Sequence, residues 1–217
     1  AYQSHRGNSP TGTTGTTYYI PSSLTTVVIT GGQIVAGAFD DCKNLTSITL
    51  PNTATMIDIY AFSGCTGLTD ILIPESITKI ADDAFYSCSN LKNVHITSLE
   101  KWCAIEFYTY RYSSSIDCSN PLRYGGNLYV NGVLVTDLVI PSTVNSIAAG
   151  AFYGCTSITS VTIPSTVTEI GMLAFTNCTN LQTLTVTVGI TELPLYVFQG
   201  FSGLKPVNLH ASHNKIH

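Results

Sequence analysis

The sequence predicts a single curved solenoid, a right-handed stack of β-rich coils of ~23 residues with a parallel sheet and short helical or 3-10 turns. One phrase recurs at a fixed period, and its apolar residues alternate as in a β-strand. Apolar residues make up 44% of the 217 and charged residues only 10%, the reverse of a disordered chain. We therefore expect one substantial folded domain.

The repeating unit is 23 residues long and reads A-F-x-x-C-x-x-L-x-x-[IV]-x-[IL]-P-x-x-[VI]-x-x-I-x-x-x. Full copies start at Ala38, Ala61, Ala84, Ala151 and Ala174. A degraded copy starts at Val197, where Phe201 stands in place of the cysteine, and a partial unit precedes the first copy. One coil cannot bury both sides of its apolar slab, so the coils are expected to stack.

Each element of the unit follows from its residues. The stretch L-x-x-I-x-I, as in Leu68, Ile71 and Ile73, ends in a period of two and predicts a strand. The proline after it has no N–H to donate and marks the strand end. The chain then turns, returns an apolar pair inward, and makes a short corner at A-F. Strand centres are expected near residues 27–29, 48–50, 71–73, 94–96, 138–140, 161–163, 184–186 and 207–209.

This unit resembles the BspA-type leucine-rich repeat of bacterial and protozoan cell-surface proteins. The resemblance covers roughly residues 20 to 210 and rests on A-F-x-x-C-x-x-L-x-x-[IV]-x-[IL]-P. It implies a leucine-rich-repeat solenoid and a role in binding, because such repeats present surfaces to varied partners.

An irregular insertion of about residues 97–126 interrupts the repeat, and a hairpin of about 127–136 turning at Asn131-Gly132 follows it. The insertion holds the only tryptophan and a cluster of tyrosines beside arginines, residue types that dominate binding hot spots. The candidate ligand-binding residues are Trp102, Tyr108, Tyr110, Arg111 and Tyr112. The alternative is that these aromatics fill a small core where the stack thins.

The outward positions of the strands are a second candidate surface. They carry mostly Thr and Ser, with Leu72 and His95 as the residues best suited to contact a ligand. An extended protein or a glycan could bind such a face through many weak contacts. Simple solvation of a β surface is the alternative.

The seven cysteines divide into two groups. Five recur with the repeat and are expected to form a reduced ladder in the core: Cys42, Cys65, Cys88, Cys155 and Cys178. Cys103 and Cys118 bracket the insertion, where they form either a disulfide closing a loop or two unpaired thiols.

Several functional classes are disfavoured. The net charge is −4 and the basic residues are scattered, which argues against nucleic-acid binding. No apolar run reaches the ~20 residues of a membrane span. No zinc-ligand spacing, phosphate-binding loop or nucleophile elbow is present, so we expect no metal, no cofactor and no catalysis.

We therefore expect a monomeric, non-enzymatic, extracellular or cell-surface adhesion module. Its partner would be an extracellular protein or glycan of the host matrix or a neighbouring cell. The alternatives are a structural stalk within a larger surface protein and, third, a hydrolase acting on glycan or peptide. The expected organisation is a flexible Gly/Thr-rich lead-in over 1–19, one repeat domain over 20–210 and a tail over 211–217.

Overall fold

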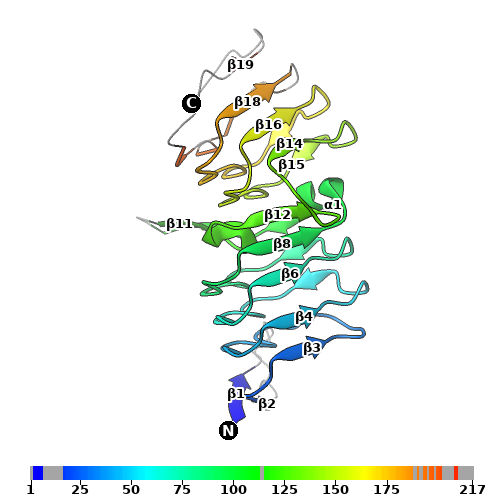
Figure 1. Ribbon diagram of the computed structural model, residues 1–217, viewed down its shortest axis with the longest axis vertical. Helices are drawn as coiled ribbons and strands as arrows, with labels where there is room; N and C mark the ends of the chain where they lie inside the picture. Colours follow the sequence, from blue (N-terminus) through cyan, green and yellow to red (C-terminus); the bar gives the residue numbers. More distant parts are fainter. Residues whose placement is uncertain are drawn as a thin grey trace.

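The computed structural model describes residues 2–6, 17–112, 115–187, 190, 193–194, 196–197, 199–201 and 208–209. They form a solenoid whose coils rise in chain order along the long axis of the molecule (Figure 1). The fold class predicted from the repeat is confirmed. Each coil contributes one strand to a long sheet on one side of the stack, and five coils also contribute a shorter strand to a second row.

The long sheet contains the outward-facing surface considered below. Its strands are β3 (Thr26–Val28), β4 (Ser47–Thr49), β6 (Asp70–Leu72), β8 (Asn93–Ile96), β12 (Asn127–Val130), β14 (Asp137–Val139), β16 (Ser160–Ile163), β18 (Thr183–Val186) and β19 (Asn208–Leu209). Hydrogen bonding divides this parallel row into β3–β4, β6–β8–β12 and β14–β16–β18–β19. Inward residues lie beside inward residues of the next coil, as Ile71 does beside Val94, so the register keeps the core continuous.

The second row consists of short return strands. They are β5 (Met56–Ile57), β7 (Lys79–Ile80) and β9 (Glu106–Phe107), followed by β15 (Ser146–Ile147) and β17 (Glu169–Ile170). The chain passes from the long sheet to this row through a turn that begins at the repeated proline. In the coil after β6, for example, the carbonyl oxygen of Pro74 accepts from the N–H of Ile77 at 3.1 Å. The proline therefore lies after the strand and starts the turn, as its missing N–H allows.

The A-F corners stack on one another through their aromatic rings. The rings of Phe39 and Phe62 are 5.5 Å apart, those of Phe62 and Phe85 are 5.4 Å apart, and Phe152 and Phe175 repeat the arrangement at 5.2 Å. All but Phe39 are fully buried. Such parallel stacking adds to the area buried between coils.

In three coils the repeated cysteine connects the coil to the one before it. The thiol of Cys65 donates to the carbonyl oxygen of Phe39 at 3.1 Å, and that of Cys88 donates to Phe62 at 3.0 Å. Cys178 makes the same contact with Phe152. The thiol is a small, weak donor that adds a second hydrogen bond to a carbonyl oxygen already accepting a backbone N–H, so the repeated cysteine has a packing role.

Each corner also contains two residues with left-handed backbone, one before the alanine of A-F and one four positions later. The first set is Gly37, Tyr60, Asp83, Gly150, Leu173 and Tyr196, and the second is Asp41, Gly64, Ser87, Gly154, Asn177 and Gly200. Gly, Asn and Asp occupy this region most readily, which explains why they recur at these positions.

The insertion adds irregular elements between β8 and β14. They are α1 (Leu99–Cys103), β9, the antiparallel pair β10 (Thr109–Tyr112) and β11 (Ser115–Cys118), the 3-10 helix η1 (Pro121–Tyr124), then β12 and β13 (Val133–Leu134). Helix α1 begins at Ser98, whose side-chain oxygen accepts from the N–H of Lys101 at 3.2 Å. The hairpin β12–β13 turns at Asn131-Gly132, and both residues have positive φ as a type I′ turn requires.

The insertion joins the two half-stacks on either side of it. The indole Nε1 of Trp102 donates to the carbonyl oxygen of Ala151 at 2.8 Å, and Asn120 Nδ2 donates to the same oxygen and to that of Gly150. The N–H of Ala148 in turn donates to the carbonyl oxygen of Cys103 at 2.8 Å. We call Trp102, Asn120 and their partners the joint.

The long-sheet strands lie at the expected places, beginning about one residue earlier than the predicted centres. One strand was not predicted in the row, since β12 lies beside β8 and takes the place of a regular rung. The segment predicted as a lead-in contains β1 (Tyr2–Arg6) and most of β2 (Thr17–Pro21), which pair antiparallel. Its flexibility stays a prediction, and the expected tail at 211–217 lies outside the described residues.

Candidate functional site

The outward face of the long sheet carries two parallel rows of side chains near the middle of the stack. Because side chains alternate along a strand, residues two apart on one strand share this face. The apolar row is formed by Leu72, His95, Tyr129 and Leu134, and the polar row by Asp70, Asn93 and Asn127. We call these two rows together the sheet face.

The apolar row is exposed although the residues beneath it are fully packed. Leu72 is 50% exposed and Leu134 is 40% exposed. Between them the rings of His95 and Tyr129 stack with their centroids 4.7 Å apart. Exposed leucines adjoining a stacked aromatic pair form a surface on which a ligand can bury apolar area.

The polar row is held in position by hydrogen bonds along the stack. Asn93 Nδ2 donates to Asp70 Oδ1 at 2.8 Å, and Asn127 Nδ2 donates to Asn93 Oδ1 at 3.1 Å. Burial raises the pKa of the Asp70 carboxyl, but hydrogen bonds from Thr69, Asn93 and His95 outweigh it and hold the pKa below its ordinary value. The row therefore presents a carboxylate and two oriented amides.

His95 connects the two rows, because its Nε2 lies 3.3 Å from Asp70 Oδ1 while its ring stacks on Tyr129. No Lys or Arg occupies an outward position of the described strands β3, β4, β6, β8, β12, β14, β16 and β18. The fixed charges on this face are the carboxylates of Asp70 and Asp137. The face is thus weakly acidic as well as partly apolar.

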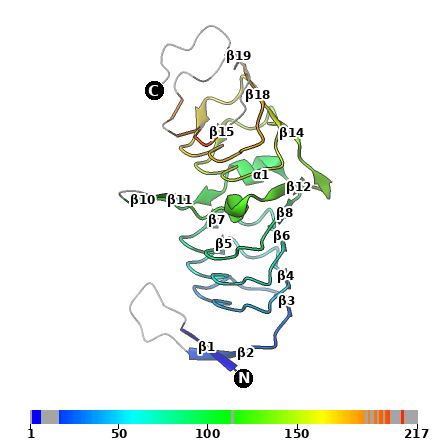
Figure 2. The same cartoon turned by 60° about the vertical axis from the view of Figure 1, so that its left-hand side comes forward.

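The insertion residues do not form one patch with this face. In Figure 2, β10 and β11 lie on the side of the stack opposite β3, β4, β6 and β8. Tyr108 is 45% exposed there. The side chains of Tyr110, Arg111 and Tyr112 lie outside the described part of the chain.

Trp102 is not at the surface, so its expected contact with a ligand is corrected to a structural role. It is only 1% exposed, packs edge to face on Phe107 at 5.2 Å and donates to Ala151 within the joint. For this residue the small-core alternative applies. A buried indole needs a hydrogen-bond acceptor, and the joint supplies one.

The disulfide considered between Cys103 and Cys118 is not formed, and both thiols are buried. Cys103 ends α1, whereas Cys118 ends β11 with its Sγ 3.9 Å from the carbonyl oxygen of Gly150. The five repeated cysteines are also buried and form no disulfide. Burial raises the pKa of Cys103 and Cys88 to about 12 and that of Cys155 to about 11, which disfavours the nucleophilic thiolate.

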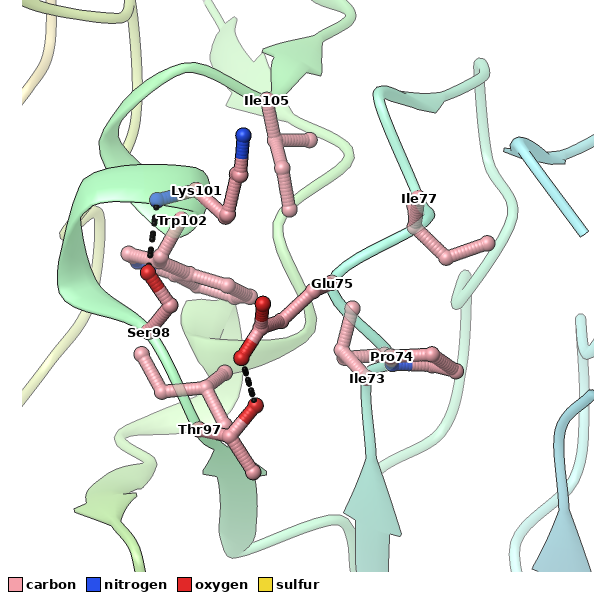
Figure 3. A pocket seen from close by; sticks show the side chains of 10 residues that line it. Ile73, Pro74, Glu75, Ile77, Thr97, Ser98, Lys101, Trp102 and Ile105 are labelled. Atoms are coloured by element: carbon pink, nitrogen blue, oxygen red, sulfur yellow. Dashed lines mark hydrogen bonds between the residues drawn. The ribbon is translucent and has the colours of Figure 1, made fainter. Parts of the chain in front are cut away.

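A depression on the described surface lies between the Pro74 turn and α1 (Figure 3). It is open, encloses about 190 Å³ including solvent, and is lined by apolar side chains with Glu75 and Lys101. Figure 3 shows the carboxylate of Glu75 already accepting from Thr97 Oγ1, at 2.6 Å. Among the described residues, no cluster of three His, Cys, Asp or Glu could hold a metal, and no helix is long and apolar enough to cross a membrane.

Tyr129, Asn127 and Leu134 are not among the ligand-binding residues predicted from the sequence, although Tyr129 belongs to its cluster of tyrosines. A signal was present, because N-L-Y-V at 127–130 repeats the pattern of N-V-H-I at 93–96. Reading 127–130 as one more rung would have placed Tyr129 beside His95.

Stacked coils with this phenylalanine, cysteine and leucine spacing are typical of leucine-rich-repeat proteins. The sequence matches the BspA type leucine rich repeat region, with six copies, over residues 32–128 and 123–217. The chain belongs to this family. The two matched segments meet at η1 and β12, near the joint between the half-stacks.

Solved structures show the same likeness. A leucine-rich cell-surface protein from Faecalibacterium prausnitzii is 30% identical, with a TM-score of 0.51 over 84% of this chain and 46% of that one. A leucine-rich repeat protein from Eubacterium ventriosum is 22% identical, with a TM-score of 0.40 over 85% of this chain and 66% of that one. The chain thus spans less than half of the first structure. A comparison with curated proteins finds no match.

Proposed function

We propose that the protein is a non-enzymatic binding module at the cell surface, and that the sheet face is its primary contact surface for an extracellular partner. The observation that carries this proposal is the exposure of Leu72 and Leu134 on either side of the His95–Tyr129 stack. Threonine or serine fills most other outward positions, and these residues are sufficient for a solvated spacer. The exposed apolar residues of the sheet face are therefore better explained by contact with a partner. The printed description of the F. prausnitzii protein as a cell-surface protein agrees with the proposed location.

The chemistry of the face favours adhesion over catalysis. The apolar row offers area to bury, and the polar row offers a carboxylate and amides as directional contacts. Each contact is weak alone, but repeated proteins on a cell surface gain avidity by binding at many points. The His95–Asp70 pair lies on an open face, and the described thiols near the core have raised pKa values.

The insertion is a secondary contact surface in this proposal. Its exposed Tyr108, together with the predicted binding residues Tyr110, Arg111 and Tyr112, would meet a partner on the other side of the stack. A partner that wraps around the solenoid would touch both surfaces. A compact partner would touch one.

The experiment that tests this proposal is a binding screen of the protein against immobilised matrix proteins and glycans. For any molecule captured, the double variant Leu72→Ser/Tyr129→Ala should weaken binding by about tenfold or more. The control Val35→Ser changes a side chain with similar exposure, 52%, outside the sheet face and should leave binding within about twofold.

A further variant, Tyr110→Ala/Tyr112→Ala, measures the contribution of the insertion. If only this variant loses binding, the primary surface is the insertion and the sheet-face proposal fails. If the chain is a stalk, neither variant changes the behaviour of the protein because nothing is captured.

A further inference from the structure

The long sheet is interrupted between β12 and β14, and the interruption leaves strand edges with unused backbone groups. Among the described strands, the strand order on one side ends at β13, which pairs only with β12. On the other side it begins at β14, which pairs only with β16. β4 also ends a short sheet, but there the Phe39–Phe62 stack holds the next coil against it.

The unused groups on β14 follow from the hydrogen bonds on its other side. In a parallel strand the N–H and C=O of one residue point to the same neighbour, and alternate residues point to opposite neighbours. Thr136 and Ile140 bond to β16, through Ser160 N–H to Thr136 O at 3.2 Å and Ile140 N–H to Thr162 O at 3.0 Å. The backbone groups of Asp137 and Val139 therefore point toward the interruption, and they make no hydrogen bond within the described part of the chain.

The same reasoning applies to the outer edge of β13. The N–H of Val135 donates to the carbonyl oxygen of Leu128 at 2.8 Å, so the backbone of Leu134 points away from β12. The side chains beside these edges are exposed: Val133 is 69% and Val139 is 61% exposed. Figure 2 shows the hairpin after β12 extending outward from the stacked strands.

We propose that β14 accepts an added strand from a partner protein at this interruption, and this inference rests on the proposed binding function. Only an extended polypeptide offers N–H and C=O groups alternating at the spacing that Asp137 and Val139 require. Natural proteins cover or charge such edges when they are not used. Here the neighbouring side chains are apolar, with one carboxylate.

The side chains define the chemistry of the partner strand. Asp137 is exposed, accepts from Ser160 Oγ at 2.5 Å, and is the sole charged residue at the outward positions of the described strands β14, β16 and β18. An apolar residue of the added strand would cover Val139, and a basic residue would lie near Asp137. The partner is therefore a strand that carries a basic residue and an apolar residue two positions apart, on the same face.

Amide hydrogen exchange by NMR tests the proposal directly. The probe is a short peptide in which lysine and valine are two residues apart, with threonine between them, so that both lie on one face of the added strand. In the free protein the amides of Asp137 and Val139 should exchange at least about tenfold faster than that of Leu138, which is bonded to β16. Adding the peptide should slow the first two by about tenfold or more and leave the third unchanged.

A proline at position 139 removes the outward N–H without removing any hydrogen bond of the stack. Val139→Pro should weaken peptide binding by about tenfold, whereas Val139→Thr, which keeps the N–H, should stay within about threefold. A peptide that is N-methylated on alternate residues removes the matching donors and should not bind. If the circular dichroism spectrum of Val139→Pro shows that this variant is unfolded, the N-methylated peptide still tests the hydrogen bonds between the peptide and β14.

Three outcomes overturn the inference. The first is that the amides of Asp137 and Val139 prove to be protected already in the free protein. The second is that they become protected only as the protein concentration rises, which would mean that a second copy covers the edge. The third is that the N-methylated peptide binds as well as its parent. None of these touches the proposed function, which fails separately if the Leu72→Ser/Tyr129→Ala variant retains binding to the captured molecule.

Discussion

The indole Nε1 of Trp102 donates a 2.8 Å hydrogen bond to the carbonyl oxygen of Ala151, 49 residues further along the chain. The bond links helix α1 of the insertion to the first A-F corner of the second half-stack. Both residues are essentially inaccessible to solvent. The only tryptophan of the chain therefore holds the two halves of the solenoid together.

Replacing this tryptophan should destabilise the protein without weakening ligand binding. Trp102→Phe removes the donor and part of the buried ring, and should lower the free energy of unfolding by about 2 kcal/mol. Urea denaturation of the wild type and the variant measures this change in the free energy of unfolding. Tyr86→Phe, at a half-exposed ring, is the control and should change stability by no more than about 0.5 kcal/mol. If Trp102→Phe keeps its stability but loses ligand binding, Trp102 contacts the ligand and its structural role is wrong.

Close approach between coils explains one glycine of the second half-stack. A Cβ on Gly171 would lie 2.5 Å from the Cα of Ala149 and nearer still to its backbone nitrogen. Gly171→Ala should therefore lower the unfolding free energy by about 3 kcal/mol, since backbone must move. Gly31→Ala, where nothing lies within 4 Å, should cost no more than about 0.5 kcal/mol. Equal melting curves for the two variants would show that the coils are spaced more widely.

The left-handed corner position offers a stabilising change. Ser87 has φ of 57°, and the equivalent residue in three other coils is glycine. Ser87→Gly should raise the unfolding free energy by about 0.5 kcal/mol, because the Cβ strain removed exceeds the added entropy of the unfolded chain. Ser89→Gly, two residues on at an exposed position without positive φ, should lower it by a similar amount. Thermal unfolding of both variants checks the sign.

The buried thiols predict a loss of stability in alkali. Below pH ~8.5 the thiols are protonated in both states, so their contribution is fully present. Between that pH and the folded pKa of about 12, Cys103 ionises only in the unfolded chain, and stability falls as pH rises. Unfolding free energies at pH 8, 9 and 10 should fall more steeply with pH in the wild type than in Cys103→Ala, and the difference between the slopes should grow towards about 1.4 kcal/mol per pH unit as the pH rises past the unfolded-state pKa. Parallel slopes would mean that the thiol is exposed.

The repetitive part of the fold could be predicted because the 23-residue period is visible in the sequence itself. Leu68, Ile71 and Ile73 alternate, Pro74 ends the strand, and the same spacing returns in each coil, so inward and outward positions follow directly. That is why Leu72 and His95 could be placed on the outward face before the structure was known.

The insertion has no period, and its contacts could not be derived in the same way. An aromatic residue in a loop is as compatible with a small core as with a binding patch, and only the position of Ala151 decides the role of Trp102. The interruption of the sheet depends on how far the β12–β13 hairpin bends away from β14. The direction of this hairpin cannot be predicted from the order of apolar and polar residues in the sequence.

Hydroxyl-radical footprinting of the protein, alone and with a molecule captured in the binding screen, shows whether the sheet face is the contact surface. If the sheet face binds the partner, labelling of Leu72, His95 and Tyr129 falls in the complex. Labelling of the exposed corner tyrosines Tyr60 and Tyr86, which are 42% and 48% accessible, should stay the same. Protection of Tyr60 and Tyr86 with unchanged labelling of the sheet face would contradict the proposal that the sheet face is the contact surface.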